Sequence, residues 1–81
     1  MFKKEDIKNE IQKDDIIQVI TPFWNGGIGQ CDKIEDNYIT VVPVKDETYR
    51  EEYQSITHSV ILPIEDIHVL IKVNKEEIKN D

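Results

Sequence analysis

Cysteine, the residue that forms disulfides and thiolate metal sites, is almost absent from the sequence. Cys31 is the single cysteine among 81 residues, so neither an internal disulfide nor a multi-thiolate metal site can form. That usage is typical of a reducing compartment. Residues 1–6 are not followed by the apolar stretch of a signal peptide, and no apolar run approaches the roughly 20 residues of a membrane helix. We therefore expect a cytoplasmic protein.

Arginine is scarce as well, and acidic residues outnumber basic ones. The formal net charge is −7, and Arg50 is the one arginine. Because nucleic-acid-binding proteins take most of their non-specific affinity from Lys and Arg, direct binding to DNA or RNA is disfavoured. Alanine is absent while Ile, Lys and Asn are abundant, a composition that indicates an AT-rich genome such as that of a low-GC bacterium or its phage.

The acidic residues occur mostly as adjacent pairs, from Glu5-Asp6 to Glu76-Glu77. Two interpretations stay open. Ordinary solubility accounts for a net charge of this size. Alternatively, the carboxylates imitate a phosphate backbone and occupy the basic groove of a nucleic-acid-binding protein, as a phage-type inhibitor would.

The length of the chain allows one small domain, which buries about two-thirds of the surface that its unfolded chain exposes. Such a core contributes little net stability, so binding at the surface is expected rather than in a deep cavity. Spacings typical of zinc or calcium sites are absent, and no set of Ser, His and carboxylate follows from the sequence. We expect no enzymatic activity and no metal or cofactor.

Apolar periodicity divides the chain into an N-terminal helix or arm at 1–13, a strand-rich domain at 14–73 and a charged tail at 74–81. In the first segment Ile7 and Ile11 lie four residues apart among charged residues. This spacing predicts a short amphipathic helix that lies on a sheet. A helix of this length is marginal in water, so tertiary packing must hold it.

From Asp15 onward the apolar period changes to two, which predicts β-strands. The strands are expected at 16–21, 28–34, 38–44, 55–62 and 67–73, the first three as a meander joined by a turn at Gly26-Gly27. Residues 45–53 predict a loop or one helical turn. Residues 63–66 predict a tight helical turn, because Pro63 presets the backbone for a helical start.

Alternation within the strands predicts which side chains face the core. The last strand shows it most clearly. Ile67, Val69, Ile71 and Val73 are predicted to share one face, with His68 and Lys72 on the other and Leu70 between them. We expect Ile39 and Val41 of the third strand to be buried together with Val69 and Ile71.

Three motifs carry a resemblance to a known superfold: Asp15-Ile16-Ile17-Gln18-Val19, Asn37-Tyr38-Ile39-Thr40-Val41 and Leu62-Pro63-Ile64-Glu65-Asp66-Ile67. Together with the order of the elements, they resemble the small β-barrels shared by Src-homology-type (SH3-like) and Sm-like domains. The last motif is similar to the short helical turn before the closing strand of those barrels. The resemblance implies a mainly β, five-stranded barrel, in which closure pairs edges that would otherwise recruit other chains.

The resemblance does not imply one activity. Src-homology domains bind proline-rich peptides on an aromatic groove, and their acidic-loop and Trp-Trp signature is missing here. Sm-like domains form rings that bind RNA, and their Gly, Asn and basic pore signatures are missing too. Function must therefore be argued from this chain's own surface residues.

The connection between the first two strands carries the only tryptophan. Phe23, Trp24 and Asn25 precede the Gly26-Gly27 turn. Aromatic residues are costly to leave in water and are enriched at binding hot spots, which favours a docking site. Alternatively, Phe23 and Trp24 fold back as a lid on the end of the barrel. The sequence leaves both interpretations open.

A second aromatic pair lies in the polar segment between the third and fourth strands. Tyr49 and Tyr53 align if the segment is helical, and Arg50 lies between them. With Phe23 and Trp24 they are candidates for one aromatic, acid-rimmed face that binds a basic protein surface through stacking and cation–π contacts. The alternative is a solvated loop whose tyrosines cover the neighbouring strands.

Structural or surface positions, rather than functional ones, are expected for the remaining candidate residues. Cys31 lies mid-strand, where it suits an inward-facing small hydrophobe, and acidic neighbours raise the pKa of a thiol rather than activate it. His58 and His68 lack the further ligands that a zinc site needs, so surface positions are expected.

The leading hypothesis is a non-enzymatic protein-binding module, a regulatory adaptor or inhibitor that uses the aromatic, acid-rimmed loop surface to bind a protein with a basic surface. One alternative is the phage-type inhibitor that mimics nucleic-acid charge. The other is a Sm-like homo-oligomer whose edges pair into a ring.

Overall fold

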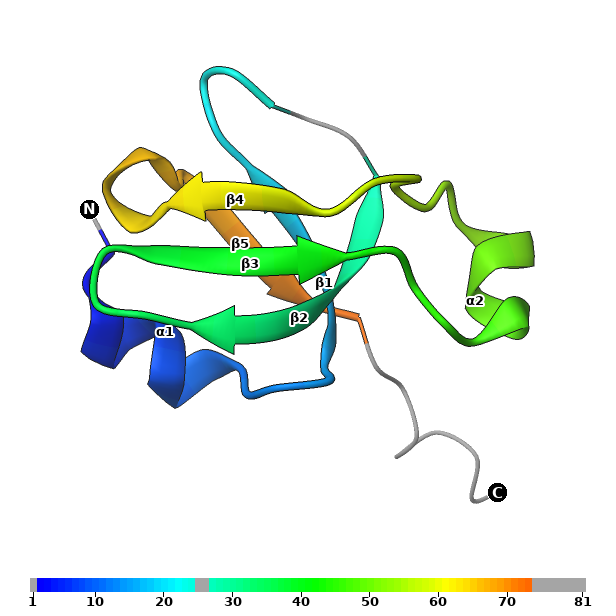
Figure 1. Cartoon of the computed structure of the whole chain (residues 1–81), viewed down its shortest axis with the longest axis horizontal. Helices are drawn as coiled ribbons and strands as arrows, with labels where there is room; N and C mark the ends of the chain where they lie inside the picture. Colours follow the sequence, from blue (N-terminus) through cyan, green and yellow to red (C-terminus); the bar gives the residue numbers. More distant parts are fainter. Residues whose placement is uncertain (1, 25–26, 74–81) are drawn as a thin grey trace.

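Five antiparallel strands form one sheet. The computed structural model describes residues 2–24 and 27–73, so the predicted tail at 74–81 lies outside the described residues. The strands are β1 (Ile16–Ile20), β2 (Ile28–Ile34), β3 (Tyr38–Val42), β4 (Val60–Pro63) and β5 (Val69–Lys72). They pair in the order β4-β3-β2-β1-β5 (Figure 1). The mainly β fold with five antiparallel strands is thereby confirmed.

The predicted N-terminal helix is present and is held by two isoleucines. α1 spans Lys4–Glu10. The backbone N–H of Lys3 donates to the Asp6 carboxylate at 2.9 Å, which satisfies a donor at the start of the helix. Ile7 and Ile11 are 0% and 3% exposed, so they anchor a helix that is too short to be stable alone.

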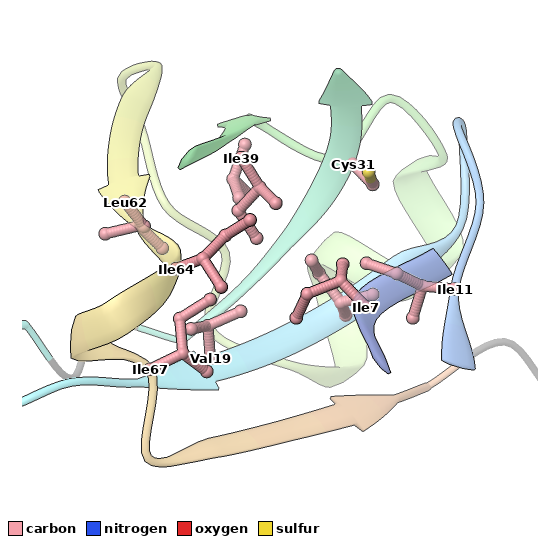
Figure 2. Close-up of a cluster of buried hydrophobic side chains, with 10 residues drawn as sticks. Ile7, Ile11, Val19, Cys31, Ile39, Leu62, Ile64 and Ile67 are labelled. Atoms are coloured by element: carbon pink, nitrogen blue, oxygen red, sulfur yellow. The ribbon is translucent and has the colours of Figure 1, made fainter. Parts of the chain in front are cut away.

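The main core lies between α1 and the sheet (Figure 2). Its buried side chains are Ile7, Ile11, Ile17, Val19, Cys31, Ile39, Val41, Leu62, Ile64 and Ile67. In Figure 2 the side chains of Ile7, Ile11 and Cys31 gather on one side, opposite those contributed by β4 and the turn that follows it. The predicted burial of Ile39 and Val41 is confirmed. The helix therefore completes a core that the strands do not enclose by themselves.

β1 is covered on both faces, which suits its four apolar β-branched residues around Gln18. A second, smaller cluster consists of Ile16, Ile28, Val44 and Val73, with Tyr49 packed against it. Successive strand residues point to opposite faces, so Ile16 faces this second cluster while Ile17 faces the main core.

The excursion between β3 and β4 differs in part from the prediction. α2 spans Glu47–Glu52, which confirms a helical turn within 45–53. β4 begins at Val60, so the strand predicted from residue 55 was wrong over its first half. Ser55 instead forms an isolated parallel bridge with Ile28, which ties the return of the excursion to β2.

Two glycines permit this return segment to approach β2 closely. Gly27 has φ 73°, in the left-handed region that favours glycine, and a Cβ there would overlap the Gln54 carbonyl. A Cβ on Gly29 would lie 3.1 Å from Ile56 Cδ1. Hydrogen bonds join the return segment to β2. The Ile28 N–H donates to Gln54 O at 2.8 Å, and the Ile56 N–H donates to Ile28 O at 2.9 Å.

β5 keeps the predicted period but has the opposite phase. Leu70 pairs directly with Val19 and packs against the main core, because directly opposed residues share a face. Val69 and Ile71 are 36% and 46% exposed. The prediction that these two side chains face the core was therefore wrong.

The turn before β5 explains this change of phase. The 3₁₀ helix η1 spans Ile64–Asp66 with Pro63 as its N-cap, which confirms the predicted tight turn. Ile67 closes the turn, since its N–H donates to Ile64 O at 3.1 Å, and it is buried. Its burial belongs to the helical turn, so it does not set the alternation of β5, which begins at Val69.

The sheet stays open in the part of the chain that the structure describes. β4 and β5 are its two edges, and no ladder joins them. The five-stranded arrangement implied by the resemblance is present, whereas strand pairing does not close it into a barrel. Pro63 at the end of β4 lacks an N–H donor, a feature typical of edge strands.

Replacing Leu70 with Thr should destabilise the fold more than the same change at Ile71. Loss of the Leu70 side chain removes buried apolar surface, which costs about 1–3 kcal/mol. Ile71→Thr should cost less than about 0.5 kcal/mol, because the side chain is exposed and Thr is a good strand former. Urea unfolding followed by circular dichroism measures both values. Equal losses, or a larger loss at Ile71, would contradict the phase of β5.

Candidate protein-binding surface

A tight turn presents Phe23 to solvent. Thr21 and Trp24 pair as an antiparallel bridge, with the Thr21 N–H donating to Trp24 O at 2.9 Å and the Trp24 N–H to Thr21 O at 3.3 Å. The Phe23 N–H donates to the Thr21 hydroxyl at 3.1 Å. Pro22, between Thr21 and Phe23, further restricts the backbone of the turn. Phe23 is nevertheless 85% exposed, the largest value among the exposed large hydrophobic residues of the described chain.

Trp24 has the opposite setting. It is half-buried and packs against the main core. Its outer surface lines a shallow depression together with residues 54–58. The sequence left two interpretations open for this aromatic pair, a lid on the core or an exposed position. Trp24 lies as the lid interpretation predicts, and Phe23 is exposed. Asn25, the third residue predicted for this loop, lies outside the described residues.

α2 brings the two predicted tyrosines together. The ring centroids of Tyr49 and Tyr53 lie 6.2 Å apart with an interplanar angle of 22°, so the rings are stacked. Tyr49 packs against the second cluster, and Tyr53 is 37% exposed. Asp46 caps α2, because its carboxylate accepts from the Thr48 N–H at 2.8 Å.

The side chain of Arg50 makes contacts within its own chain. Its guanidinium donates to Val44 O at 3.3 Å and lies 3.5 Å from the Glu47 carboxylate. These contacts tie α2 to the segment that follows β3. The exposed charges of α2 are mostly carboxylates.

A small hollow adjoins the exposed face of Tyr53. It has a volume of about 280 Å³ and is lined by Gln18, Gly27, Ile28, Tyr53, Gln54 and Val73. These residues come from β1, from the start of β2, from the excursion after α2 and from the end of β5. The hollow is thus assembled entirely by tertiary structure.

The predicted contact residues form two separate patches. Figure 1 shows the tip of the β1–β2 connection and α2 at separate parts of the molecule. Gln54 lies between the patches, since it lines both the depression beside Trp24 and the hollow beside Tyr53. The structure therefore does not bring Phe23 and the tyrosine pair together into one face.

A third surface was missed by the sequence analysis. A groove of about 700 Å³ runs between the start of α1 and the outer face of β3 and β4, with Tyr38, Ile61 and Pro63 in its lining. Ile61 is 66% exposed. The available signal was the run Val60-Ile61-Leu62, because three consecutive apolar residues in a strand cannot all face one core.

An ion pair crosses this groove. Lys4 Nζ and Asp36 Oδ1 lie 2.7 Å apart. The hydrogen bond and the opposite charge of Asp36 raise the pKa of Lys4, and the same contact lowers the pKa of Asp36. Both groups are solvent-exposed, so the pair orients the start of α1 and adds little to stability.

Comparisons with known proteins assign no family. No family model, no curated protein and no solved structure matches this chain. Within residues 2–24 and 27–73, no three of His, Cys, Asp and Glu converge as metal ligands do. None of the helices in those ranges has the length and hydrophobicity needed to traverse a bilayer. What the protein binds must therefore be inferred from its surfaces.

Cys31 is a core residue, as the sequence analysis expects. It is 0% exposed. Burial, followed by the charges of Asp15 and Asp32, raises the pKa of its thiol from 9.0 to about 11. The neutral thiol is thus favoured in the folded state, and its contribution to stability is present below pH 9 and lost as the pH rises through 11.

The folded protein should resist thiol reagents at mildly alkaline pH. At pH 8 Cys31 stays protonated and buried, so its reaction with Ellman's reagent should be slower than in the urea-unfolded chain by about 100-fold or more. Absorbance of the released thionitrobenzoate measures both rates. Equal rates would show that the thiol is accessible in the native state.

Proposed function

We propose that this protein is a non-enzymatic binding module, a regulatory adaptor or inhibitor that docks a protein partner through Phe23. The observation that carries the proposal is the 85% exposure of this phenyl ring on a hydrogen-bonded turn. An isolated exposed hydrophobic residue is ordinary, but this one stands on a hydrogen-bonded turn and is 85% exposed within the described residues.

The rigid turn favours binding in two ways. Burial of a Phe side chain against a partner contributes about 1.5–3 kcal/mol. Because the Thr21–Trp24 bridge already fixes the backbone, little conformational entropy is lost when the contact forms. A single aromatic anchor that enters a pocket of its partner is a common form of binding hot spot.

The partner is proposed to have a basic surface. The chain carries a net charge of −7, and exposed carboxylates surround α2 on the same molecule. Opposite charge on the partner would steer the encounter and raise the association rate. Like charge would oppose association of identical copies, so a heterologous protein is favoured over a homo-oligomer.

We further propose that the scaffold is a member of the small-barrel type to which the sequence motifs are similar. The order of the elements supports this proposal, with a meander β1–β3, an excursion containing α2, then β4, the 3₁₀ turn η1 and β5. Binding residues are disproportionately found on connections that a rigid scaffold positions. Phe23 and α2 lie on such connections.

Replacement of Phe23 with Ser should abolish partner capture without unfolding the protein. Ile61→Ser is the matched control, since Ile61 is a second exposed hydrophobic residue on a different surface. Tagged wild type and both variants are used to recover partners from lysate of the source cells. The recovered partner should bind Phe23→Ser at least about tenfold more weakly, which corresponds to about 1.4 kcal/mol.

Two outcomes of this experiment would contradict the proposal. Recovery of the same partners by wild type and Phe23→Ser would show that the turn is not the docking site. Binding that is unaffected by Phe23→Ser and collapses between low and moderate salt would favour the nucleic-acid mimic instead, because exposed charges are screened by salt.

A further inference from the structure

We infer that the hollow beside Tyr53 is a recognition pocket for an arginine side chain of the partner. This inference rests on the proposed function as a protein-binding module, and it names the chemistry that the α2 patch recognises. The pocket is physically separate from the Phe23 turn, so the two contacts can be tested independently.

The size of the hollow suits a single side chain. Its volume is about 280 Å³, at the lower limit of the roughly 300–1,000 Å³ typical of small-molecule pockets. One long side chain fills a space of this size. The hollow is open to solvent at Tyr53, so a side chain can enter from a docked partner.

The lining matches both parts of an arginine side chain. Ile28 and Val73 border the hollow, and the small part of each that stays exposed lies where the methylene stem would pass. Gln18 and Gln54 are the polar residues of the wall, and amide oxygens accept hydrogen bonds from guanidinium N–H groups. The partly exposed Tyr53 ring offers a face on which a planar guanidinium stacks, which favours arginine over lysine.

Charge around the hollow favours a cation. The hollow itself has no charged residue in its lining. The adjacent α2 segment carries exposed carboxylates at Asp46, Glu47, Glu51 and Glu52. Arg50, the cation within α2, is already engaged by Glu47 and by the Val44 carbonyl. The resulting negative field complements an arginine and repels an anionic group.

The pocket is preorganised by its backbone. The Ile28 N–H donates to Gln54 O at 2.8 Å and the Val73 N–H to Ile16 O at 2.7 Å, which fixes two of its walls. Tyr53 is held by its stack on Tyr49, which itself packs on the second cluster. No rearrangement is therefore needed for a side chain to enter, and this lowers the entropic cost of binding.

Titration with a capped arginine tests the inference without a partner protein. Acetyl-arginine methylamide is added to the ¹⁵N-labelled protein, and amide shifts are followed by NMR. We expect saturable shifts at Gln18, Gln54 and Tyr53 with a millimolar dissociation constant. Capped citrulline, which has the same shape without the charge, should bind at least about fivefold more weakly.

Two tyrosine variants sharpen the test. Tyr53→Leu should weaken binding of the capped arginine at least about threefold through loss of the stacking face, whereas Tyr53→Phe should retain it. Tyr38→Leu is the matched control, because Tyr38 is also 37% exposed but lines the groove beside α1. Dispersed spectra of each variant verify that it is folded.

The inference is overturned if capped arginine gives no saturable shifts, if capped citrulline or capped lysine binds equally well, or if the shifts map away from the hollow. Failure of the proposed function is a different result, in which Phe23→Ser leaves partner capture intact. Because the titration needs no partner, a negative result in the capture experiment does not affect it. The two experiments therefore test the two proposals separately.

Discussion

Ile28 lies between β1 and the returning excursion, and the positions of both candidate surfaces depend on that arrangement. It stands opposite Gln18 in the β1–β2 ladder, while its own N–H and C=O are hydrogen-bonded to Gln54 and Ile56. These bonds bring the chain back from α2 onto the sheet. The same contact closes the hollow beside Tyr53 and supports the depression against which Trp24 lies.

The glycines on either side of Ile28 make this arrangement possible. The Gln54 carbonyl occupies the space of a Cβ at Gly27, and Val41 and Ile56 crowd the same space at Gly29. Any larger residue at these positions would push the excursion away from the sheet. An apparently simple hairpin sequence therefore also sets the distance between two segments that are far apart in the chain.

Most of the scaffold follows from local sequence pattern. Two-residue alternation locates β1, β2 and β3, and Pro63 with two acidic residues locates η1, because these signals depend on neighbouring residues only. The phase of β5 cannot be predicted from local pattern, since it depends on the residue at which the 3₁₀ turn ends and the strand begins. The start of β4 could not be predicted for a similar reason, because the residues on either side of Ser55, Gln54 and Ile56, are hydrogen-bonded to Ile28 of β2.

The candidate site was less predictable than the fold. The sequence singled out Phe23, Trp24 and the tyrosine pair, but adjacent aromatic residues give no local signal for which one turns inward. The Thr21–Trp24 bridge decides this, and an isolated bridge of one residue pair leaves no periodic pattern in the sequence. The hollow gathers residues from four segments, so only tertiary structure brings them together.

Phe23 makes no contribution to the hydrophobic core, whereas Trp24 beside it does. Under the proposed function, scaffold and recognition fall on neighbouring positions that can change independently. Evolution could then exchange the side chain at the tip of the turn, and so redirect the module to another target, while the residues that keep the chain folded stay as they are. A protein engineer has the same freedom at that position.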